Sequence, residues 1–413
     1  MTSDTIFYKM SGGIINHFVS ISVFYFFSSG PEAPLFCCFD LILDQLKHFV
    51  LGASFSMKKR CSIMKEKRMK VLQVMGSGAD GGAETYFVDA VLALNEIGLD
   101  QAVFVRPQCN RIDLMKERVG KVYEAGFDNF LRFPTHLKMR KIIRDYKPDI
   151  IQYWMNRAGS YSVKGNHTGV AWFGDYCSLK HFKDCTYYVG VTPEIVEYEI
   201  KQGAPREKSR VIHTIAPESS REKLKRADFD TPEDAVVLLS LARLHERKAI
   251  DILIKAMKQV PSNVIAWIAG NGPLEEELKQ LARDEGVIDR LRFLGWRDDR
   301  MAMLDACDIC VFPSRYEPFG TVMVEAWAAK RPIVVCKSDG PRQYIKPYEN
   351  GILVEIDDID GLAKGINDCI NDKELVAKLI AGGTKTYEEG FSTRKVAQDY
   401  LDFYQSIMAA QAK

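Results

Sequence analysis

Residues 309–330 read ICVFPSRYEPFGTVMVEAWAAK, and this stretch decides the fold. Its first four residues, 309–312, are apolar, as in a buried strand, and a loop follows that ends at Gly320. A helix is expected from Thr321, so the free N–H groups at its start point outward at the carboxyl edge of the sheet. Strand, loop and helix in this order form the repeating unit of a parallel α/β sheet.

The same unit recurs along the chain from Val71 onward. Helical spacing of apolar residues appears at 83–94 and 137–146, and the second of these helices ends before Pro148. The strands predicted in the first half are 71–75, 102–105, 150–154, 170–173, 187–191 and 211–215. Those predicted in the second half are 236–241, 264–269, 291–294, 309–312 and 333–335, and a final helix is expected at about 393–409.

Length and composition limit the class of protein. A chain of 413 residues is too long for one ordinary core, so two domains are expected. The formal net charge of +1 provides no bulk field that would attract nucleic acid. The ten cysteines lack a ligand-like spacing, because Cys307 and Cys310 form one CxxC without a second pair. We therefore expect both to pack in the core, in a protein of a reducing cytoplasm.

The first 68 residues do not match the rest of the chain. Their aromatic-rich run from Ile14 to Phe27 is shorter than the ~20 residues that a spanning helix needs. Basic residues between Lys58 and Arg68 lead into the first clear strand. We interpret residues 1–68 as an extension outside the fold. The simplest explanation is an over-long gene model whose true start is Met64 or Met69. A membrane-surface anchor is the alternative.

Two glutamates of the opening stretch have the chemistry to hold a nucleotide sugar. Glu325 lies one turn into the predicted helix, where its carboxylate can accept two hydrogen bonds from a vicinal ribose diol. Glu317, on the loop, is near enough to touch the sugar. The N–H groups at Gly320, Thr321 and Val322, aided by the helix dipole, favour the diphosphate that joins ribose and sugar.

Two further loops are predicted to meet the same diphosphate. Residues 240–248 read SLARLHERK and follow the first strand of the second half, so that Arg243 and Lys248 can reach phosphate oxygens. Residues 76–84 read GSGADGGAE between a strand and a helix, where glycines permit close approach of the backbone. The glycine spacing is not GxGxxG, so a dinucleotide-dependent dehydrogenase is not indicated.

These motifs together resemble glycosyltransferase family 4, whose members have the GT-B fold. The resemblance rests on Glu317 and Glu325 within EPFG…EA, where Phe319 and Gly320 are in register. Residues 240–248 are similar to the family's Gly-Arg-Leu…Lys-Gly pattern, in which Arg and Lys neutralise the leaving pyrophosphate. This chain departs from it with alanine at positions 242 and 249, where glycine is usual. The resemblance makes Glu317, Arg243 and Lys248 the catalytic residues.

The resemblance also assigns residues of the first half. The GSGADGGAE stretch is similar to the family's first loop, whose Gly82 lies near the donor phosphates and the acceptor. The segments 154–158 and 172–175 resemble a branch found among bacterial lipopolysaccharide glycosyltransferases, which makes Asn156 and Asp175 candidate contacts of acceptor or sugar. Many relatives carry histidine near position 174 or 175, and this chain does not. The donor-binding set is then Gly82, Arg243, Lys248, Glu317, Phe319, Gly320, Thr321, Val322 and Glu325.

What the resemblance implies is an α/β protein of the GT-B fold, with two facing Rossmann-like domains and a C-terminal crossover helix. The expected parts are an acceptor-side domain at 69–217, a linker at 218–234, a nucleotide-sugar-binding domain at 235–392 and, at 393–413, a helix that packs back on the first domain. The implied activity is that of a retaining hexosyltransferase without cofactor. Its donor is a nucleotide-diphosphate sugar, and its acceptor is a glycan or a lipid-linked glycan in lipopolysaccharide or cell-surface polysaccharide synthesis.

Metal dependence is not predicted. Asp228-Phe229-Asp230 and Asp358-Ile359-Asp360 formally match the Asp-x-Asp of metal-dependent transferases. The first pair lies in the linker, and Asp360 is interpreted as the N-cap of a helix. Two alternatives to a transferase stay open: a nucleotide-sugar-binding protein without transferase activity, and a nucleotide-sugar epimerase.

A basic amphipathic stretch indicates where the protein works. Lys138, Arg140, Lys141 and Arg144 alternate with apolar residues in the helix predicted at 137–146. A solvated charged face and a contact with anionic lipid are both compatible with this pattern. We therefore expect a cytoplasmic protein, peripheral on the inner membrane in the second case, with no nucleic-acid partner.

Overall fold

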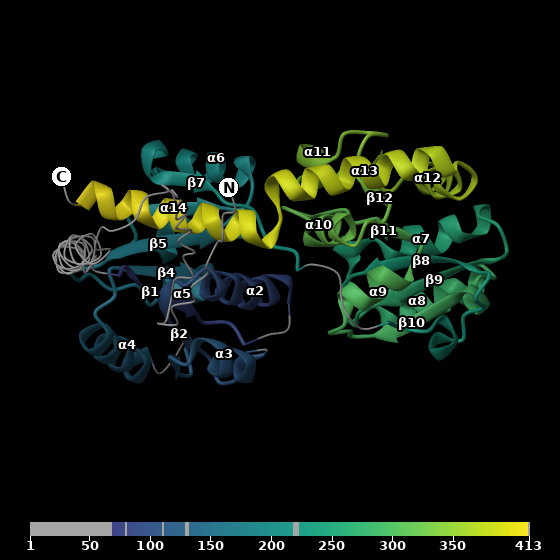
Figure 1. Ribbon diagram of the computed structural model, residues 1–413. Helices are drawn as coiled ribbons and strands as arrows, with labels where there is room; N and C mark the ends of the chain where they lie inside the picture. Colours follow the sequence, from purple (N-terminus) through teal and green to yellow (C-terminus); the bar gives the residue numbers. More distant parts are fainter. Residues whose placement is uncertain (1–67, 79–80, 110, 129–131, 218–222, 412–413) are drawn as a thin grey trace, which may run out of the picture. The chain divides into compact units, whose positions relative to one another are not determined.

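The computed structural model describes residues 68–78, 81–109, 111–128, 132–217 and 223–411 (Figure 1). The predictions made for residues 1–67, including the start at Met64, lie outside the described residues. So do the first residues of the predicted linker, 218–222.

The first Rossmann-like domain is built on a seven-stranded parallel sheet of order β3-β2-β1-β4-β5-β6-β7. The central strands are mostly apolar and buried because helices cover both faces of a parallel sheet. Its strands are β1 (Lys70–Met75), β2 (Asp100–Val105), β3 (Val122–Glu124), β4 (Ile150–Trp154), β5 (Thr168–Phe173), β6 (Tyr187–Gly190) and β7 (Ser209–Val211). Its helices are α2 (Gly82–Glu96), α3 (Ile112–Val119), α4 (Arg132–Tyr146), α5 (Met155–Gly159) and α6 (Pro193–Lys201).

The second Rossmann-like domain has a six-stranded parallel sheet of order β10-β9-β8-β11-β12-β13. Its strands are β8 (Val236–Leu241), β9 (Val264–Ala269), β10 (Leu291–Gly295), β11 (Ile309–Phe312), β12 (Ile333–Cys336) and β13 (Ile352–Val354). The helices are α7 (Ile250–Ala256), α8 (Glu275–Asp284), α9 (Arg300–Ala306), α10 (Thr321–Ala328), α11 (Pro341–Tyr344), α12 (Ile359–Asn371) and α13 (Lys373–Gly390). The last described helix, α14 (Thr393–Gln411), follows α13.

Each sheet has one point where the strand order reverses. In the first it lies between β1 and β4, and in the second between β8 and β11. The loops after the two strands at such a point turn away from each other and leave a crevice at the carboxyl edge, which is where α/β proteins bind ligands. The loops of the second domain at this point are those that carry Arg243 and Glu317.

The predicted strands and the structure differ chiefly in the shortest elements. The last strand of the first domain runs over Ser209–Val211, so the strand predicted at 211–215 is wrong in its placement. Ile212 and Ile215 are buried beyond the end of β7; the N–H of Ile212 still donates to the carbonyl of Gly190 in β6 at 3.1 Å, but neither residue belongs to a strand. Strands β3 and β13 were not predicted, because three residues are too few to show a period. Cys307 and Cys310 are buried, as expected.

Helix α14 confirms the predicted crossover. Helix α13 packs against α10 of the second domain, whereas α14 packs against α2 of the first (Figure 1). The hydroxyl of Tyr400 lies 3.0 Å from that of Tyr86, and the Tyr404 hydroxyl donates to Gln152 at 2.5 Å. The end of the chain therefore belongs structurally to the domain where the sheet begins.

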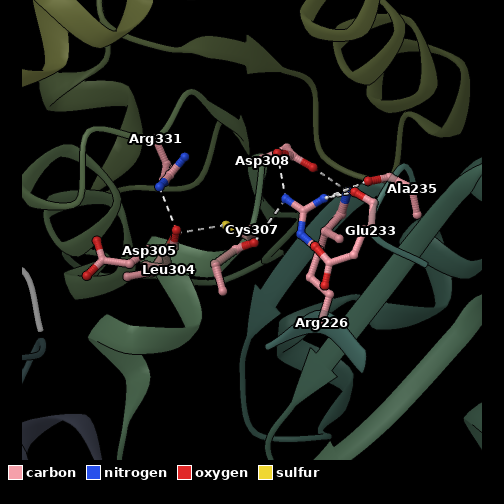
Figure 2. Close-up of polar contacts among 10 residues, drawn as sticks. Arg226, Glu233, Ala235, Leu304, Asp305, Cys307, Asp308 and Arg331 are labelled. Carbon is pink, nitrogen blue, oxygen red and sulfur yellow. Dashed lines mark hydrogen bonds and ion pairs between the residues drawn. The ribbon is translucent and has the colours of Figure 1, made fainter. Parts of the chain in front are cut away.

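The described part of the predicted linker is fixed to the second domain. Arg226, in the 3₁₀ turn η3 (Arg226–Phe229), donates to the carbonyl of Ala235 at 2.8 Å and to Asp308 at 2.8 Å (Figure 2). The other oxygen of Asp308 accepts from the backbone N–H of Val237 at 2.7 Å. Arg226 and Asp308 thus tie this segment to the starts of β8 and β11.

Candidate active site

A cavity of about 1270 Å³ lies where the two domains meet. The first domain contributes Gly81, Gly82, Asp89 and Arg111 to its lining. Residues of the second domain in the lining include Arg243, Lys248, Asn271, Trp296, Arg297, Arg300, Glu317, Thr321, Val322 and Glu325. The cavity is therefore lined by loops that are far apart in the sequence.

Backbone hydrogen bonds to two neighbouring loops hold the loop after β11 in place. The N–H of Gly340 donates to the carbonyl of Glu317 at 2.7 Å, and the N–H of Arg315 donates to the carbonyl of Arg247 at 2.8 Å. Gly320 has a φ of 95°, in the left-handed region, directly before α10 begins at Thr321. Glycine at this position lets the chain turn into the helix while the first N–H groups stay open to the cavity.

The loop after β8 carries two cations with different surroundings. Lys248 donates to the carboxylate of Glu317, and its ammonium lies 5.8 Å from the centre of the Phe312 ring. The Arg243 guanidinium makes no ion pair or side-chain hydrogen bond with any residue that the structure describes. Two predicted catalytic residues thus pair with each other, and the third is available to an anion in the cavity.

Ala242 and Ala249 of this loop occupy positions that differ in the backbone conformation they require. Ala249 is buried and has a φ of 52°, in the left-handed region that glycine adopts without strain. This conformation explains why glycine is usual at this position. Ala242 has no such backbone requirement, but its carbonyl closely approaches Gly270. A Cβ on Gly270 would lie 1.9 Å from that oxygen. The departure at Ala249 therefore stores some strain, and the one at Ala242 does not.

Glu325 lies in the first turns of α10 and faces charged residues of two other helices. Its Oε1 accepts from Nε of Arg300 at 2.5 Å, and Nη2 of Arg300 donates to Asp89 of α2 at 2.8 Å. The other oxygen of Asp89 accepts from Arg111 at 2.7 Å. Burial alone lowers the pKa of Arg300, but the carboxylates of Glu325 and Asp89 outweigh it and raise the pKa above its ordinary value.

Gly82 opens α2 at the edge of the cavity. A Cβ added there would meet nothing within 4 Å, so the helix start faces open space. The preceding residue, Gly81, also lines the cavity, and Asp80 lies outside the described residues. The cavity is therefore bordered by the N-termini of two helices, α2 and α10, whose dipoles favour an anion.

Four residues of the predicted site do not line the cavity: Gly320, which turns the chain into α10, and Phe319, Asn156 and Asp175. Phe319 is buried and packs with His213, at 6.3 Å between ring centres, and with Tyr344, at 5.6 Å, so its ring has a packing role and its donor contact stays a prediction. Asn156 and Asp175 do not line the cavity. Asp175 accepts a hydrogen bond from the hydroxyl of Tyr316 at 2.6 Å.

Several cavity residues were not predicted. Asp89, Arg111 and Arg300 lie within helices or at their starts, where sequence patterns indicate solvated charges rather than a site. Trp296 and Arg297 follow β10, and their place directly after a strand is a signal that would have pointed to the carboxyl edge. Asn271 follows β9 in the same way.

Neither Asp-x-Asp pair reaches the cavity. Asp358, not Asp360, is the N-cap of α12, since its side chain accepts from the N–H of Gly361 at 2.8 Å. Asp360 accepts from Gln259 instead. The carbonyl of Asp230 accepts from Arg292. Among the described residues there is no cluster of three or more His, Cys, Asp or Glu arranged to hold a metal.

Known proteins resemble the chain in sequence and in fold. Residues 221–386 match the family described as glycosyl transferases group 1. The lipopolysaccharide core biosynthesis glycosyltransferase LpsE of Rhizobium meliloti is 36% identical over 336 residues, which are 80% of this chain and 97% of that protein. Its counterpart LpsD from the same organism is 33% identical, over 81% of this chain and 98% of the relative.

A solved structure confirms the fold. The crystal structure of the Anabaena protein HepE in complex with UDP-glucose has a TM-score of 0.72 with this chain, covers 82% of it and is covered completely. Its sequence identity of 23% extends the likeness to the fold alone. The two Rhizobium relatives, in contrast, are more than 30% identical and are matched over nearly their whole length. The predicted GT-B fold and the predicted family are therefore both confirmed, and the chain belongs to the group 1 glycosyl transferases.

Proposed function

We propose that this glycosyltransferase moves a hexose from a nucleotide-diphosphate donor to a lipid-linked glycan, with retention of configuration and without a metal ion. One observation carries the proposal. Arg243, Lys248 and Glu317 line the same cavity as the N-termini of α2 and α10. A diphosphate with a sugar at one end and a ribose at the other matches this set of cations, N–H groups and carboxylates.

The chain's own residues supply the stabilisation of the leaving group. Charge builds on the diphosphate as the glycosidic bond breaks, and Arg243 together with the N–H groups at Thr321 and Val322 stabilises that charge. Lys248 adds a second cation, which Glu317 holds at the cavity wall. In the proposed reaction the leaving phosphate takes the proton of the acceptor hydroxyl on the same face of the sugar, so the configuration is retained.

The acceptor is proposed from the relatives. Both Rhizobium proteins are named for lipopolysaccharide core biosynthesis, and each matches at least 80% of this chain. We propose that a growing lipopolysaccharide core is the acceptor here as well. The first domain is the acceptor side, because the second contributes most of the groups that fit the donor.

A transfer assay tests the donor and the acceptor together. The chain is incubated with UDP-, GDP- and ADP-hexoses and with lipopolysaccharide truncated in its core, and the products are analysed by mass spectrometry and by NMR, which distinguishes isomers of equal mass. We expect one donor to be consumed and the acceptor to gain the mass of one hexosyl residue, with the anomeric configuration of the donor. An isomerised nucleotide sugar without transfer would indicate an epimerase, and no change with any donor would indicate a binding protein.

Chelation tests the role of the cations. Turnover should survive EDTA, because Arg243 and Lys248 carry the charge that a metal would otherwise carry. If EDTA abolishes turnover and magnesium or manganese restores it, the metal-independent mechanism is wrong.

We further propose that helix α4 meets the membrane that holds the acceptor. Its buried face is formed by Met139 and Ile142, so the cations Lys138, Arg140, Lys141 and Arg144 lie on the exposed face. Phe133 and Leu137, one turn apart, are 72% and 51% exposed. Exposed apolar residues beside cations are typical of a helix that lies on an anionic lipid surface. Among the described residues, no helix combines the length and apolar character needed to cross a membrane.

Vesicle co-sedimentation tests this contact. The chain should bind anionic vesicles and not neutral ones, with each nearby cation contributing about 1 kcal/mol and less as salt rises. Changing the four cations of α4 to Gln should abolish binding. The matched control changes the exposed cations Lys364, Lys373, Lys378 and Lys385 to Gln, which removes the same charge from the second domain. Equal losses in both variants would show a general charge effect and remove α4 as the contact.

A further inference from the structure

Two charged side chains, Arg300 and Asp89, link the proposed ribose carboxylate of Glu325 to the first domain. Arg300, at the start of α9, donates to Glu325 through Nε and to Asp89 through Nη2, at 2.5 and 2.8 Å. Resting on the proposed ribose contact of Glu325, we propose that Arg300 and Asp89 are positioning residues. They hold the Glu325 carboxylate so that one oxygen stays free for the ribose hydroxyls.

Arg300 divides its hydrogen bonds between Glu325 and Asp89, and this division gives Asp89 its proposed role. An arginine beside a single carboxylate tends to bind both of its oxygens side by side. Here Asp89 takes the outer nitrogen of Arg300, so Arg300 reaches Glu325 through Nε and only at Oε1. Oε2 of Glu325 accepts no hydrogen bond from any residue that the structure describes, and Glu325 lines the cavity. Asp89 thereby keeps Arg300 off Oε2, the Glu325 oxygen that stays free for the ribose hydroxyls.

Burial shows that this link is no surface ion pair. The side chains of Asp89, Glu325 and Arg300 are 8%, 5% and 20% exposed. Such groups are screened little by solvent and hold a fixed geometry more firmly than exposed pairs do. Arg111 completes the neutralisation of Asp89 from the far side, at 2.7 Å. The set Arg111, Asp89, Arg300 and Glu325 is therefore a chain of alternating charge whose two carboxylates are buried.

The link also joins the two domains at the point of donor binding. Asp89 belongs to α2, whose N-terminus at Gly82 borders the cavity, and Glu325 belongs to α10, whose N-terminus borders it too. A change in the contact between α2 and α9 would release Arg300 and let it cover Glu325. Binding of the ribose in the second domain is thus made dependent on a residue of the first.

The test compares nucleoside diphosphates with their 2′-deoxy forms. The pairs UDP and dUDP, GDP and dGDP, and ADP and dADP are titrated by calorimetry, and the base that binds the wild-type chain is used. Loss of one ribose hydroxyl should weaken binding by about tenfold in the wild type. The ratio of the two Kd values reports the diol contact alone. Both Kd values are measured on the same protein sample, so a loss of stability in a variant affects both equally and does not change their ratio.

Three variants and one control decide the outcome. Glu325→Gln, Asp89→Asn and Arg300→Lys should each bring the ratio to within about twofold of one. Lysine keeps the charge of Arg300 but cannot bridge two carboxylates with separate nitrogens. The control is Asp308→Asn, which removes a carboxylate from the Arg226 pair of Figure 2 and should leave the ratio unchanged.

The possible failures are distinguishable. If Glu325→Gln keeps the tenfold ratio, or if no nucleoside diphosphate binds the wild type, the proposed donor site itself is wrong. If Glu325→Gln loses the ratio but either Asp89→Asn or Arg300→Lys keeps it, the positioning role is overturned and the donor site stands. To exclude direct contact by Asp89, the double variant with Glu325→Gln should show no further change in Kd for the deoxy form. An added loss there would also overturn the proposal.

Discussion

The two Rossmann-like domains have the same kind of strand reversal but use it differently. In the second domain, both loops at the reversal, after β8 and after β11, reach the cavity and bond to each other through Lys248 and Glu317. In the first domain the loop after β1 reaches it at Gly82, whereas Asn156, after β4, does not line it. A shared topology therefore locates the edge where ligands bind, and the loops decide which domain holds the charges.

The loops of the second domain that border the cavity are held more rigidly than the loop at Gly82 of the first domain. Its two loops are joined by side chains and by backbone, since the N–H of Arg315 donates to the carbonyl of Arg247, and Arg315 also pairs with Asp251 at 2.6 Å. Groups fixed in this way lose little freedom when a ligand binds. The open space above Gly82 implies a looser contact in the first domain.

The largest effect is expected at Glu317. Glu317→Ala removes the carboxylate nearest the proposed sugar and releases Lys248, so turnover should fall by about ten- to a hundredfold, or roughly 1.5–3 kcal/mol. Initial rates at saturating donor provide the measurement, with circular dichroism to check folding. Glu197→Gln, which breaks the exposed pair with Arg206, is a control of the same charge. Activity of Glu317→Ala within twofold of the wild type would remove Glu317 from the site.

A smaller effect separates the two cations. Arg243 has no side-chain partner among the described residues, so Arg243→Gln should raise the donor KM about tenfold through loss of a phosphate contact. Lys248→Gln also leaves Glu317 without its cation, so it should lower kcat as well as raise KM. Steady-state kinetics at varied donor concentration separate these two patterns. Identical changes in both variants would show that pairing with Glu317 makes no difference.

The smallest effect is expected in the first domain. Gly82→Ala places a methyl group in open space at the start of α2, so folding should be unaffected and the donor KM should rise by only about threefold, less than 1 kcal/mol. The same kinetic assay measures it. A loss as large as that of Glu317→Ala would mean that the first domain holds the donor as firmly as the second, and the comparison between the domains would fail.

Strand, loop and helix patterns were sufficient to predict two α/β halves and to bring Arg243, Lys248 and Glu317 to one edge of a sheet, whereas the GT-B fold was implied by the family resemblance. Loops after parallel strands meet at that edge whatever their composition, so the sequence order alone carries this information. The structure places these residues in one cavity, and their roles in catalysis stay predictions.

The remaining residues of the site could not be predicted because their neighbours are set by packing. Arg300 reaches Glu325, 25 positions away, and Asp89, 211 positions away, and no periodic pattern links the three helices. Phe319 shows the opposite case. It stands between residues that line the cavity, but its ring gains more from burial with His213 and Tyr344 than it would in an open site.

A crystal structure of the chain with the nucleoside diphosphate that binds it would test the central claim most directly. The claim is that the second domain holds the donor, by Arg243, by the N–H groups that open α10, and by Glu325. The account predicts diphosphate oxygens within hydrogen-bonding distance of Arg243 and of the N–H groups of Thr321 or Val322, and ribose hydroxyls against Glu325. A diphosphate bound at Gly82 with no contact to the loops after β8 and β11 would contradict it.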